Sequence, residues 1–393
     1  MSAPRGAASA AANVAARFTL RDLVWYFLHL GAFGFGGPIA LIGYMQRDLV
    51  DTRRWFDISD YKEGLALAQL APGPLAAQLA IYLGWLHSGV RGATLVGVAF
   101  ILPSFCLVLG LSAFYVAYGG IAWMQGAFYG IGAAVIAIIA RGAFRLAKTT
   151  LGHDYLSWGL FAASACVTAW TESELMWLFV LCGLVTLAAR TRGRTTAAWA
   201  LAPWWLVTGL AGPASCDTLW RIGCAFAEAG TFVFGSGLAI VPFLHGTVVQ
   251  HLEWLTERQF LDAVAVAMIT PGPVVITVAF IGYLVAGPLG ATVAAIGVFL
   301  PCYLFVLIPA RFFRQSVHDP RVKAFVDGVT TAAAGAIAGA ALVLGRRAVS
   351  DVPTALIALT ALVVLPRVGS AAEPLLIVIA GAVGVMLSAT LSP

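Results

Sequence analysis

The stretch from Gly31 to Pro38 reads GAFGFGGP, and its glycines and proline interrupt an apolar segment that would otherwise continue as one helix. A second interruption, Pro72-Gly73-Pro74, follows in equally apolar surroundings. Both interruptions return 199 residues later, as GTFVFGSG from Gly230 and as Pro271-Gly272-Pro273. Aligning residues 27–74 with 226–273 without a gap gives 13 identities in 48 positions. The chain is therefore a duplication whose copies each carry two broken helices.

The composition is that of a polytopic, all-α membrane protein. Of 393 residues, 61% are hydrophobic and 10% are charged, against about 25% charged in soluble domains. No Asp, Glu, Lys or Arg occurs between Gly92 and Ala140 or between Ala263 and Ala310, and each run is long enough for two crossings of about 20 residues. The net charge of +5 then reports loop orientation and does not indicate nucleic-acid binding.

Four regions are expected along the chain. They are a disordered tail (1–16), a first repeat (17–192), a connector helix (193–217) and a second repeat (218–393). In the first repeat, a helix is expected to start at Pro38, a charged loop to run from Arg47 to Lys62, and spans to follow near 92–118, 122–146, 155–170 and 174–190.

Basic residues distinguish the orientation of the two repeats. Loop 47–62 holds four basic residues, and the equivalent 246–261 holds one. Loop 119–123 holds none, and the equivalent 311–323 holds four. The positive-inside rule therefore predicts inverted-topology repeats, the plan of many secondary transporters. The same rule favours re-entrant hairpins over full crossings for the broken elements.

A helix that begins inside a membrane presents unpaired N–H groups and a positive dipole end, and both favour an anion. Such starts are expected after Gly37, Pro74, Gly237 and Pro273, and inverted copies would bring them together near the midplane. The predicted substrate-binding residues are those of the breaks with their neighbouring polar side chains: Gly34, Phe35, Gly36, Gly37, Pro38, Gln69, Pro72, Gly73, Pro74, Gly235, Ser236, Gly237, Thr270, Pro271, Gly272 and Pro273.

Ionisable residues within apolar runs are candidates for coupling and recruitment. Glu228 and its repeat partner His29 can both take up a proton, although they can equally form a structural pair. Arg47 and Lys62 flank the first breaks and would attract anions, unless they serve only as topology signals. Asp262, near the start of the last broken helix, is expected to interact with its helix dipole.

No enzyme or cofactor signature is present. The six histidines have no metal-ligand spacing, the six cysteines form no C-x-x-C pair, and no nucleotide fingerprint occurs. We expect no catalytic residues, no metal and no cofactor. The expected partners are an oxyanion and the lipid bilayer, with proton coupling and a homodimer left open.

Several motifs together resemble the chromate ion transporter family. They are FGFGGPIALIGYM (33–45), LAQLAPGP (67–74) and LPSF (102–105), with FVFGSG (232–237), TPGP (270–273) and LPCY (300–303) in the second copy. The resemblance covers residues 18–392, as in a full-length, two-domain member. It implies chromate efflux across the bacterial inner membrane and chromate resistance, with chromate or a sulfate-like oxyanion as the bound partner. In this sequence Ser236 stands opposite Gly37, and Gly237 stands opposite Pro38.

The expected function is a secondary transporter that exports chromate. An uptake carrier for sulfate or another oxyanion, and a passive anion channel, are the alternatives that the residues leave open.

Overall fold

The computed structural model describes residues 18–35, 37–118, 122–151, 154–171, 176–190, 216–232, 240–310, 320–349, 351–368 and 373–391. Within these ranges the chain is helical and contains no strand, which confirms the predicted all-α class. Four segments there are long and apolar enough to cross a membrane: Leu75–Tyr118, Trp123–Phe144, Val274–Ala310 and Asp327–Arg346. The tail 1–16, most of the connector, Gly36 and Gly235–Gly237 lie outside the described residues.

The first repeat opens with two helical hairpins. The first hairpin pairs α2 (Leu20–Phe33) with α3 (Gly37–Met45), and the second pairs α4 (Ile58–Leu70) with the first arm of α5 (Leu75–Tyr118). The outer ends of both hairpins meet, because the Phe18 ring stacks on Trp55 at 4.5 Å and Nε2 of His87 lies 3.1 Å from the Phe18 carbonyl oxygen. Both broken elements therefore enter and leave at the same end of the molecule.

A π-helix replaces part of the charged loop expected over residues 47–62. Helix α3 continues directly into the π-helix η1 (Gln46–Thr52), and α4 already begins at Ile58. The intervening turn contains Arg54 with φ of 55°, and the equivalent Glu253 has φ of 49°. The loop prediction was wrong here because backbone hydrogen bonds, such as that from Arg53 N to Asp48 O, extend the helix through the charged residues.

Helix α5 folds back on itself after the second hairpin. Ser88 and Gly89 leave the helical conformation, and Gly89 has φ of 60°. A Cβ atom on Gly84 would lie 2.5 Å from the carbonyl oxygen of Gly92, so the two arms cross with backbone almost touching. The long second arm is followed by α6 (Ala122–Leu151), α7 (Tyr155–Thr171) and α8 (Met176–Arg190).

The second repeat has the elements of the first in the same order, with the short 3-10 helix η4 added between α11 and α12. They are α9 (Cys216–Phe232), α10 (Ile240–His245), η3 (Gly246–His251), α11 (Glu257–Ile269), η4 (Val274–Ile276), α12 (Thr277–Ala310), α14 (Pro320–Ala348), α15 (Val352–Val368) and α16 (Glu373–Leu391). Helix α12 folds back at Ala286-Gly287, as α5 does at Ser88-Gly89. In the first repeat, the spans predicted near 122–146, 155–170 and 174–190 agree with α6, α7 and α8 to within a few residues.

The hairpins of the second repeat begin at the opposite end of the molecule. Helix α11 starts beside the far end of α5, where the Tyr115 hydroxyl donates to Asp262 Oδ2 at 2.7 Å. Arg258, one turn earlier in α11, donates to the Gln125 carbonyl in α6 at 3.4 Å. The first repeat's hairpins instead begin beside residues 87–89, where α5 bends, at the other end of its long second arm. The two sets of hairpins therefore point toward each other, as inverted repeats require.

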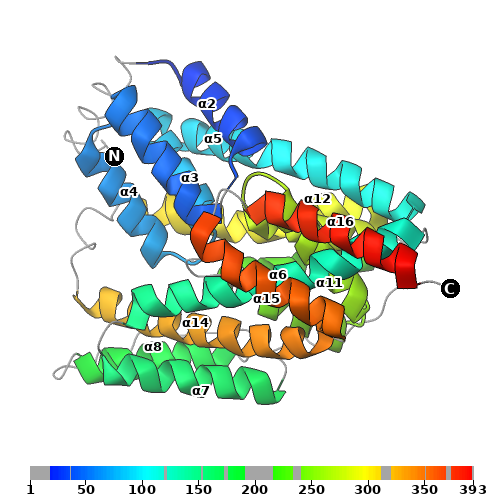
Figure 1. Cartoon of the computed structure of the whole chain (residues 1–393). Helices are drawn as coiled ribbons and strands as arrows, with labels where there is room; N and C mark the ends of the chain where they lie inside the picture. Colours follow the sequence, from blue (N-terminus) through cyan, green and yellow to red (C-terminus); the bar gives the residue numbers. More distant parts are fainter. Residues whose placement is uncertain are drawn as a thin grey trace, which may run out of the picture.

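The repeats also exchange their last two helices. Helices α7 and α8 pack against α14 of the second repeat, and α15 and α16 pack against α6 of the first (Figure 1). Glycines permit these contacts on both sides. A Cβ on Gly130 would lie 2.0 Å from the Ala380 carbonyl oxygen, and one on Gly328 would lie 2.5 Å from that of Cys182. Such close approach of backbones is typical of helix packing in membranes.

An apolar groove runs between α15 and α16, which both pack on α6 and diverge from each other. Its volume is about 630 Å³, and its walls include Leu356, Ile379 and Val383. A groove with almost no polar lining is unsuited to an anion, so the candidate site lies elsewhere.

Candidate anion-binding site

The tips of the hairpins meet in the interior of the protein. The tip of the first hairpin of repeat one contacts the tip of the second hairpin of repeat two, because Gly272 N donates to the Gly34 carbonyl at 3.0 Å. The two residues are 238 positions apart in the chain (272 − 34). The sequence prediction that breaks from both copies converge is therefore borne out for the described tips.

Each Pro-Gly-Pro tip rests against the long helix of the other repeat. Gly272 approaches Ser104 so closely that a Cβ atom would lie 2.1 Å from the serine Oγ. In the reciprocal contact, a Cβ atom on Gly73 would lie 3.0 Å from Cys302 Cβ. Ser104 and Cys302 occupy equivalent places in the LPSF and LPCY motifs. Reciprocal contacts of this kind are what a two-fold relation between the repeats generates.

Ser104 and Cys302 also fix the first hairpin of their own repeat. Ser104 Oγ donates to the Gly31 carbonyl at 3.2 Å, and Cys302 Sγ donates to the equivalent Gly230 carbonyl at 3.6 Å. Both residues are fully buried and lie near the middle of their helix arms. The tips are therefore held at half the length of the long helices, far from both ends.

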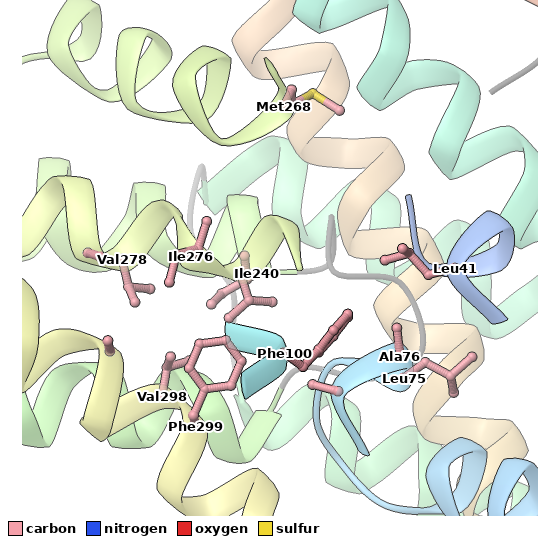
Figure 2. Packing of buried hydrophobic residues seen from close by; sticks show 14 of the residues in the cluster. Leu41, Leu75, Ala76, Phe100, Ile240, Met268, Ile276, Val278, Val298 and Phe299 are labelled. Carbon is pink, nitrogen blue, oxygen red and sulfur yellow. The ribbon is translucent and has the colours of Figure 1, made fainter. Parts of the chain in front are cut away.

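The starts of the half-helices share one apolar cluster. Phe100, one turn before Ser104, lies between Leu75 and Ala76 at the start of α5 and Ile240 at the start of α10 (Figure 2). Ile276 from η4 and Leu41 from α3 belong to the same cluster. These side chains pack the first turns of α3, α5, α10 and η4 together, and apolar surroundings of this kind strengthen electrostatic interactions nearby.

The tip residues differ in their exposure. Gly73, Pro74, Thr270, Pro271, Gly272 and Pro273 are buried, whereas Phe35 and Pro72 are half-buried and Gln69 is exposed. The Thr270 hydroxyl donates to the Ala267 carbonyl at 2.9 Å. Gly37 and Pro38 form the start of α3, one residue before the predicted helix start. Among the described tip residues, those that keep some exposed surface therefore belong to the first repeat.

None of the four predicted recruitment and coupling residues lies within a tip. His29 and Glu228 are exposed, on the outward faces of α2 and α9, about one turn before each break. Arg47 and Lys62 are exposed on η1 and α4, on the outer parts of the two hairpins. Arg47 pairs with the adjacent Asp48 at 2.9 Å, which raises the pKa of its guanidinium.

Two site residues, Ser104 and Cys302, escaped sequence reasoning, and the role expected for Asp262 was wrong. Ser104 and Cys302 stood in quoted motifs, but nothing in the sequence predicted that the opposite repeat's glycine would contact them. Asp262 was expected to interact with its helix dipole, yet it lies beyond the first turn, is buried and accepts a hydrogen bond from Tyr115 of the other repeat. Among the described residues, no three His, Cys, Asp or Glu side chains are grouped as a metal site would need.

The sequence is similar to known proteins along most of its length. The profile described as "Chromate transporter" matches residues 21–187 and 220–385, once in each half of the chain. The protein belongs to the chromate transporter family. A chromate transport protein of Cupriavidus metallidurans is 54% identical over 388 residues, covering 98% of this chain and 97% of that protein.

Two further relatives of this chromate transporter family member span most of its length. A probable chromate transport protein of Synechococcus elongatus is 52% identical, with 94% of this chain and 96% of that protein covered. A chromate transport protein of Pseudomonas aeruginosa is 33% identical, with 84% and 82% covered. No solved structure matches the chain. The family membership predicted from the motifs is therefore confirmed.

Proposed function

We propose that this protein is a secondary transporter that exports chromate across the bacterial inner membrane and so confers chromate resistance. The observation that carries the proposal is the meeting of the hairpin tips in the protein interior, fixed by the hydrogen bond from Gly272 to Gly34. Helices α3, α5 and α12 begin at these tips and direct the positive ends of their dipoles into one region. Relatives that are 54% and 33% identical are named chromate transport proteins, which supports chromate as the substrate.

A tetrahedral oxyanion suits such a region because its oxygens can accept from several backbone N–H groups at once. The glycines of the tips allow close approach of the backbone to the anion. The inverted repeats offer two equivalent halves that can rock around the shared tips, which is the usual basis of alternating access. The proposed binding residues are those of the tips, with Arg47 and Lys62 recruiting the anion at the hairpins' outer parts.

Transport measured in inverted membrane vesicles tests the substrate and direction together. We expect uphill accumulation of radiolabelled chromate that collapses when the ion gradient is removed. Uptake of sulfate in right-side-out vesicles would instead identify an import carrier. Flux that only follows the membrane potential would identify a channel. Growth of a sensitive host on chromate, sulfate, molybdate and arsenate, with and without the protein, tests resistance.

Substitutions at the tips test the site itself. Pro72→Ala and Gly36→Ala are expected to abolish chromate resistance at normal expression, because each alters a break from which a half-helix begins. Wild-type efflux from folded variants would remove these residues from the mechanism.

Glu228 and His29 are the proposed carriers of a coupled proton. Each is exposed about one turn before a tip, near the middle depth of the long helices, where an ionisable group facing lipid is costly. Glu228→Gln is expected to leave chromate exchange between equal concentrations intact and to abolish uphill transport. A second copy of the chain covering these faces is the structural alternative, and cross-linking in membranes would detect it.

A further inference from the structure

Asp262 places a carboxyl group at a contact between the two repeats. Only 5% of its surface is exposed, and its Oδ2 accepts a hydrogen bond of 2.7 Å from the Tyr115 hydroxyl near the end of α5. It forms no ion pair among the described residues, and Arg258, one turn earlier in α11, donates to the Gln125 carbonyl. A buried carboxylate is costly unless a partner or a bound proton neutralises its charge. The Tyr115 hydroxyl supplies a hydrogen bond but no positive charge.

This carboxyl group lies close to one end of the molecule, so a proton can reach it from the solution there. Asp262 is five residues after the start of α11, a rise of about 8 Å along the helix axis. Arg258 is exposed, and Tyr115 is half-buried three residues before the end of α5. Loop 47–62, at the opposite end, holds four basic residues and faces the cytoplasm by the positive-inside rule. The proton therefore comes from the external solution.

The first repeat lacks the tyrosine of this contact. Glu63 is the equivalent of Asp262 at the offset of 199, so the carboxyl group has a counterpart. The equivalent of Tyr115 at the offset of 198 is Phe313, which has no hydroxyl. The paired carboxyl and hydroxyl groups are thus a property of the external end alone. A proton-binding contact at one end only can respond to the external pH and not to the internal pH.

Helix α11 connects this contact to the candidate anion-binding site. The helix ends at Ile269, and the tip that follows it donates from Gly272 N to the Gly34 carbonyl of the first repeat. Asp262 and Gly272 are only ten residues apart (272 − 262), and most of that distance is one continuous helix. While Asp262 is held by Tyr115, the second repeat's tip cannot move away along with α11.

The strength of the contact depends on the charge of the carboxyl group. A hydrogen bond from a hydroxyl to a carboxylate is stronger than one to a neutral carboxylic acid. We propose that Asp262 and Tyr115 form a proton-operated latch, in which a proton from the external solution neutralises Asp262 and releases α11 from α5 for the transport cycle. The proton returns to the external solution when the latch closes. Asp262 is therefore a positioning residue and does not carry the coupled proton across the membrane.

This inference rests on the proposed function and adds a regulation by external pH. The ionisable groups that act on Asp262 are Tyr115 of α5 and Arg258 of its own helix. Helices α6, α12 and α16 also pack on α11, and their described residues contribute no further ionisable group to Asp262. A second titratable pair lies nearby, because His245 Nε2 is 2.8 Å from Glu257 Oε2 at the start of α11. The experiment has to separate that pair from the latch.

Chromate flux into inverted vesicles tests the latch, since their lumen corresponds to the external side. The luminal pH is set between 5 and 8, and the ratio of variant flux to wild-type flux removes the effects of driving force and of chromate protonation. For Asp262→Asn, which is always neutral, we expect a ratio near one at pH 5 that rises about tenfold at pH 8. Tyr115→Phe should show the same trend, and Asp262→Glu, which copies the first repeat, should keep the wild-type response. A ratio that is constant across pH in Asp262→Asn and Tyr115→Phe would overturn the inference.

The control for the neighbouring pair is His245→Gln, which copies Gln46 of the first repeat. We expect its flux ratio to stay constant with luminal pH. A ratio that depends on pH in His245→Gln but not in Asp262→Asn would assign the pH response to the histidine pair and overturn the latch.

Infrared difference spectra of the detergent-solubilised protein between pH 5 and 8 separate this inference from the proposed function, because they require no chromate. A band of a protonated carboxyl group that is absent in Asp262→Asn, shifted in Tyr115→Phe and retained in Glu63→Gln supports the latch even if no chromate flux is found. Chromate flux by an Asp262→Asn variant whose carboxyl bands equal those of the wild type would overturn the latch and leave the proposed function intact.

Discussion

At the scale of single residues, the site is made by glycines and by the small side chains that they touch. The sequence identified the glycines and prolines of the breaks because such residues are unexpected in apolar helices. It did not identify Ser104 and Cys302 as their neighbours, since those contacts join residues from different repeats and depend on how the helices cross. The contact of Asp262 with Tyr115 was equally unpredictable, because it also joins the two repeats.

Gly272 is the most constrained glycine among the described tip residues. It has φ of +91°, and a Cβ atom there would lie 2.1 Å from Ser104 Oγ. We expect Gly272→Ala to reduce chromate flux at least tenfold, because strain of about 1–3 kcal/mol displaces the tip. The control is Gly110→Ala in α5, where a Cβ atom meets nothing within 4 Å. Wild-type flux by a correctly inserted Gly272→Ala protein would contradict this account.

At positions 104 and 302, serine and cysteine should each support transport, whereas an apolar residue should not. Each donates to a glycine carbonyl at the equivalent place in its repeat. We therefore expect Ser104→Cys and Cys302→Ser to retain flux, and Ser104→Val to lose most of it because the Gly31 carbonyl is left without its donor. Flux of each variant at matched protein amounts measures this. If Ser104→Val were fully active, the hydroxyl would have no positioning role.

At the scale of elements, the helices could be predicted to within a few residues, and two features could not. The π-helix η1 was missed because charged residues within a short segment indicate a loop. The π-helix η3 carries no Asp, Glu, Lys or Arg and was missed because it aligns with that loop in the second repeat. Both π-helices continue a helix whose other face is buried, around Leu49 and Val248 respectively. The sequence also did not predict the exchange of terminal helices. Glycines such as Gly130 and Gly328 permit that exchange, but a glycine in an apolar helix does not reveal its partner.

The start of α15 is tied to α6 by a polar contact between Asp351, which lies outside the candidate spans, and Tyr129 of α6. Asp351 accepts hydrogen bonds from the Tyr129 hydroxyl and from Thr354, and these lower the pKa of its carboxyl group. A carboxylate whose pKa is lowered by folding stabilises the protein above its unfolded pKa, and the contribution disappears as pH falls through the lowered value. We expect Tyr129→Phe to lower the melting temperature at pH 7 by a few degrees.

The same difference in melting temperature should vanish in acid, below the lowered pKa of Asp351. The control is Tyr155→Phe, which removes the hydroxyl of a tyrosine that is 92% exposed. This substitution should leave the melting temperature unchanged at both pH values. A Tyr129→Phe effect that persists unchanged in acid would show that the hydroxyl acts through another partner.

At the scale of the whole molecule, the inverted relation was predictable from charge alone. The swap of basic residues between equivalent loops can be recognised without knowing how the helices pack. The hairpins of the two repeats begin at opposite ends of the molecule, in agreement with that swap. What charge could not indicate is that the tips of one repeat rest on the other. That contact follows from hairpins that reach only half the length of the long helices.

Labelling of single cysteines tests the orientation in the membrane. Arg54 and Glu253 are equivalent residues, both with positive φ, in the turns that join the two hairpins of each repeat. In a variant without native cysteines, Arg54→Cys and Glu253→Cys should react with a membrane-impermeant maleimide from opposite sides. Lys62→Cys is the control and should share the side of Arg54. Labelling of both turns from one side would contradict inverted repeats.

The exchange of α7 and α8 for α15 and α16 makes the two halves of the chain obligate partners. Neither half alone can cover all its helices, because the surface of α6 is covered by α16 of the second repeat and that of α14 by α7 and α8 of the first. Cutting the peptide between Arg190 and Cys216 would break none of these described contacts, so two separately made fragments retain every surface needed to recognise each other. The two repeats therefore pack like the subunits of a helix-swapped dimer whose chains are joined into one polypeptide.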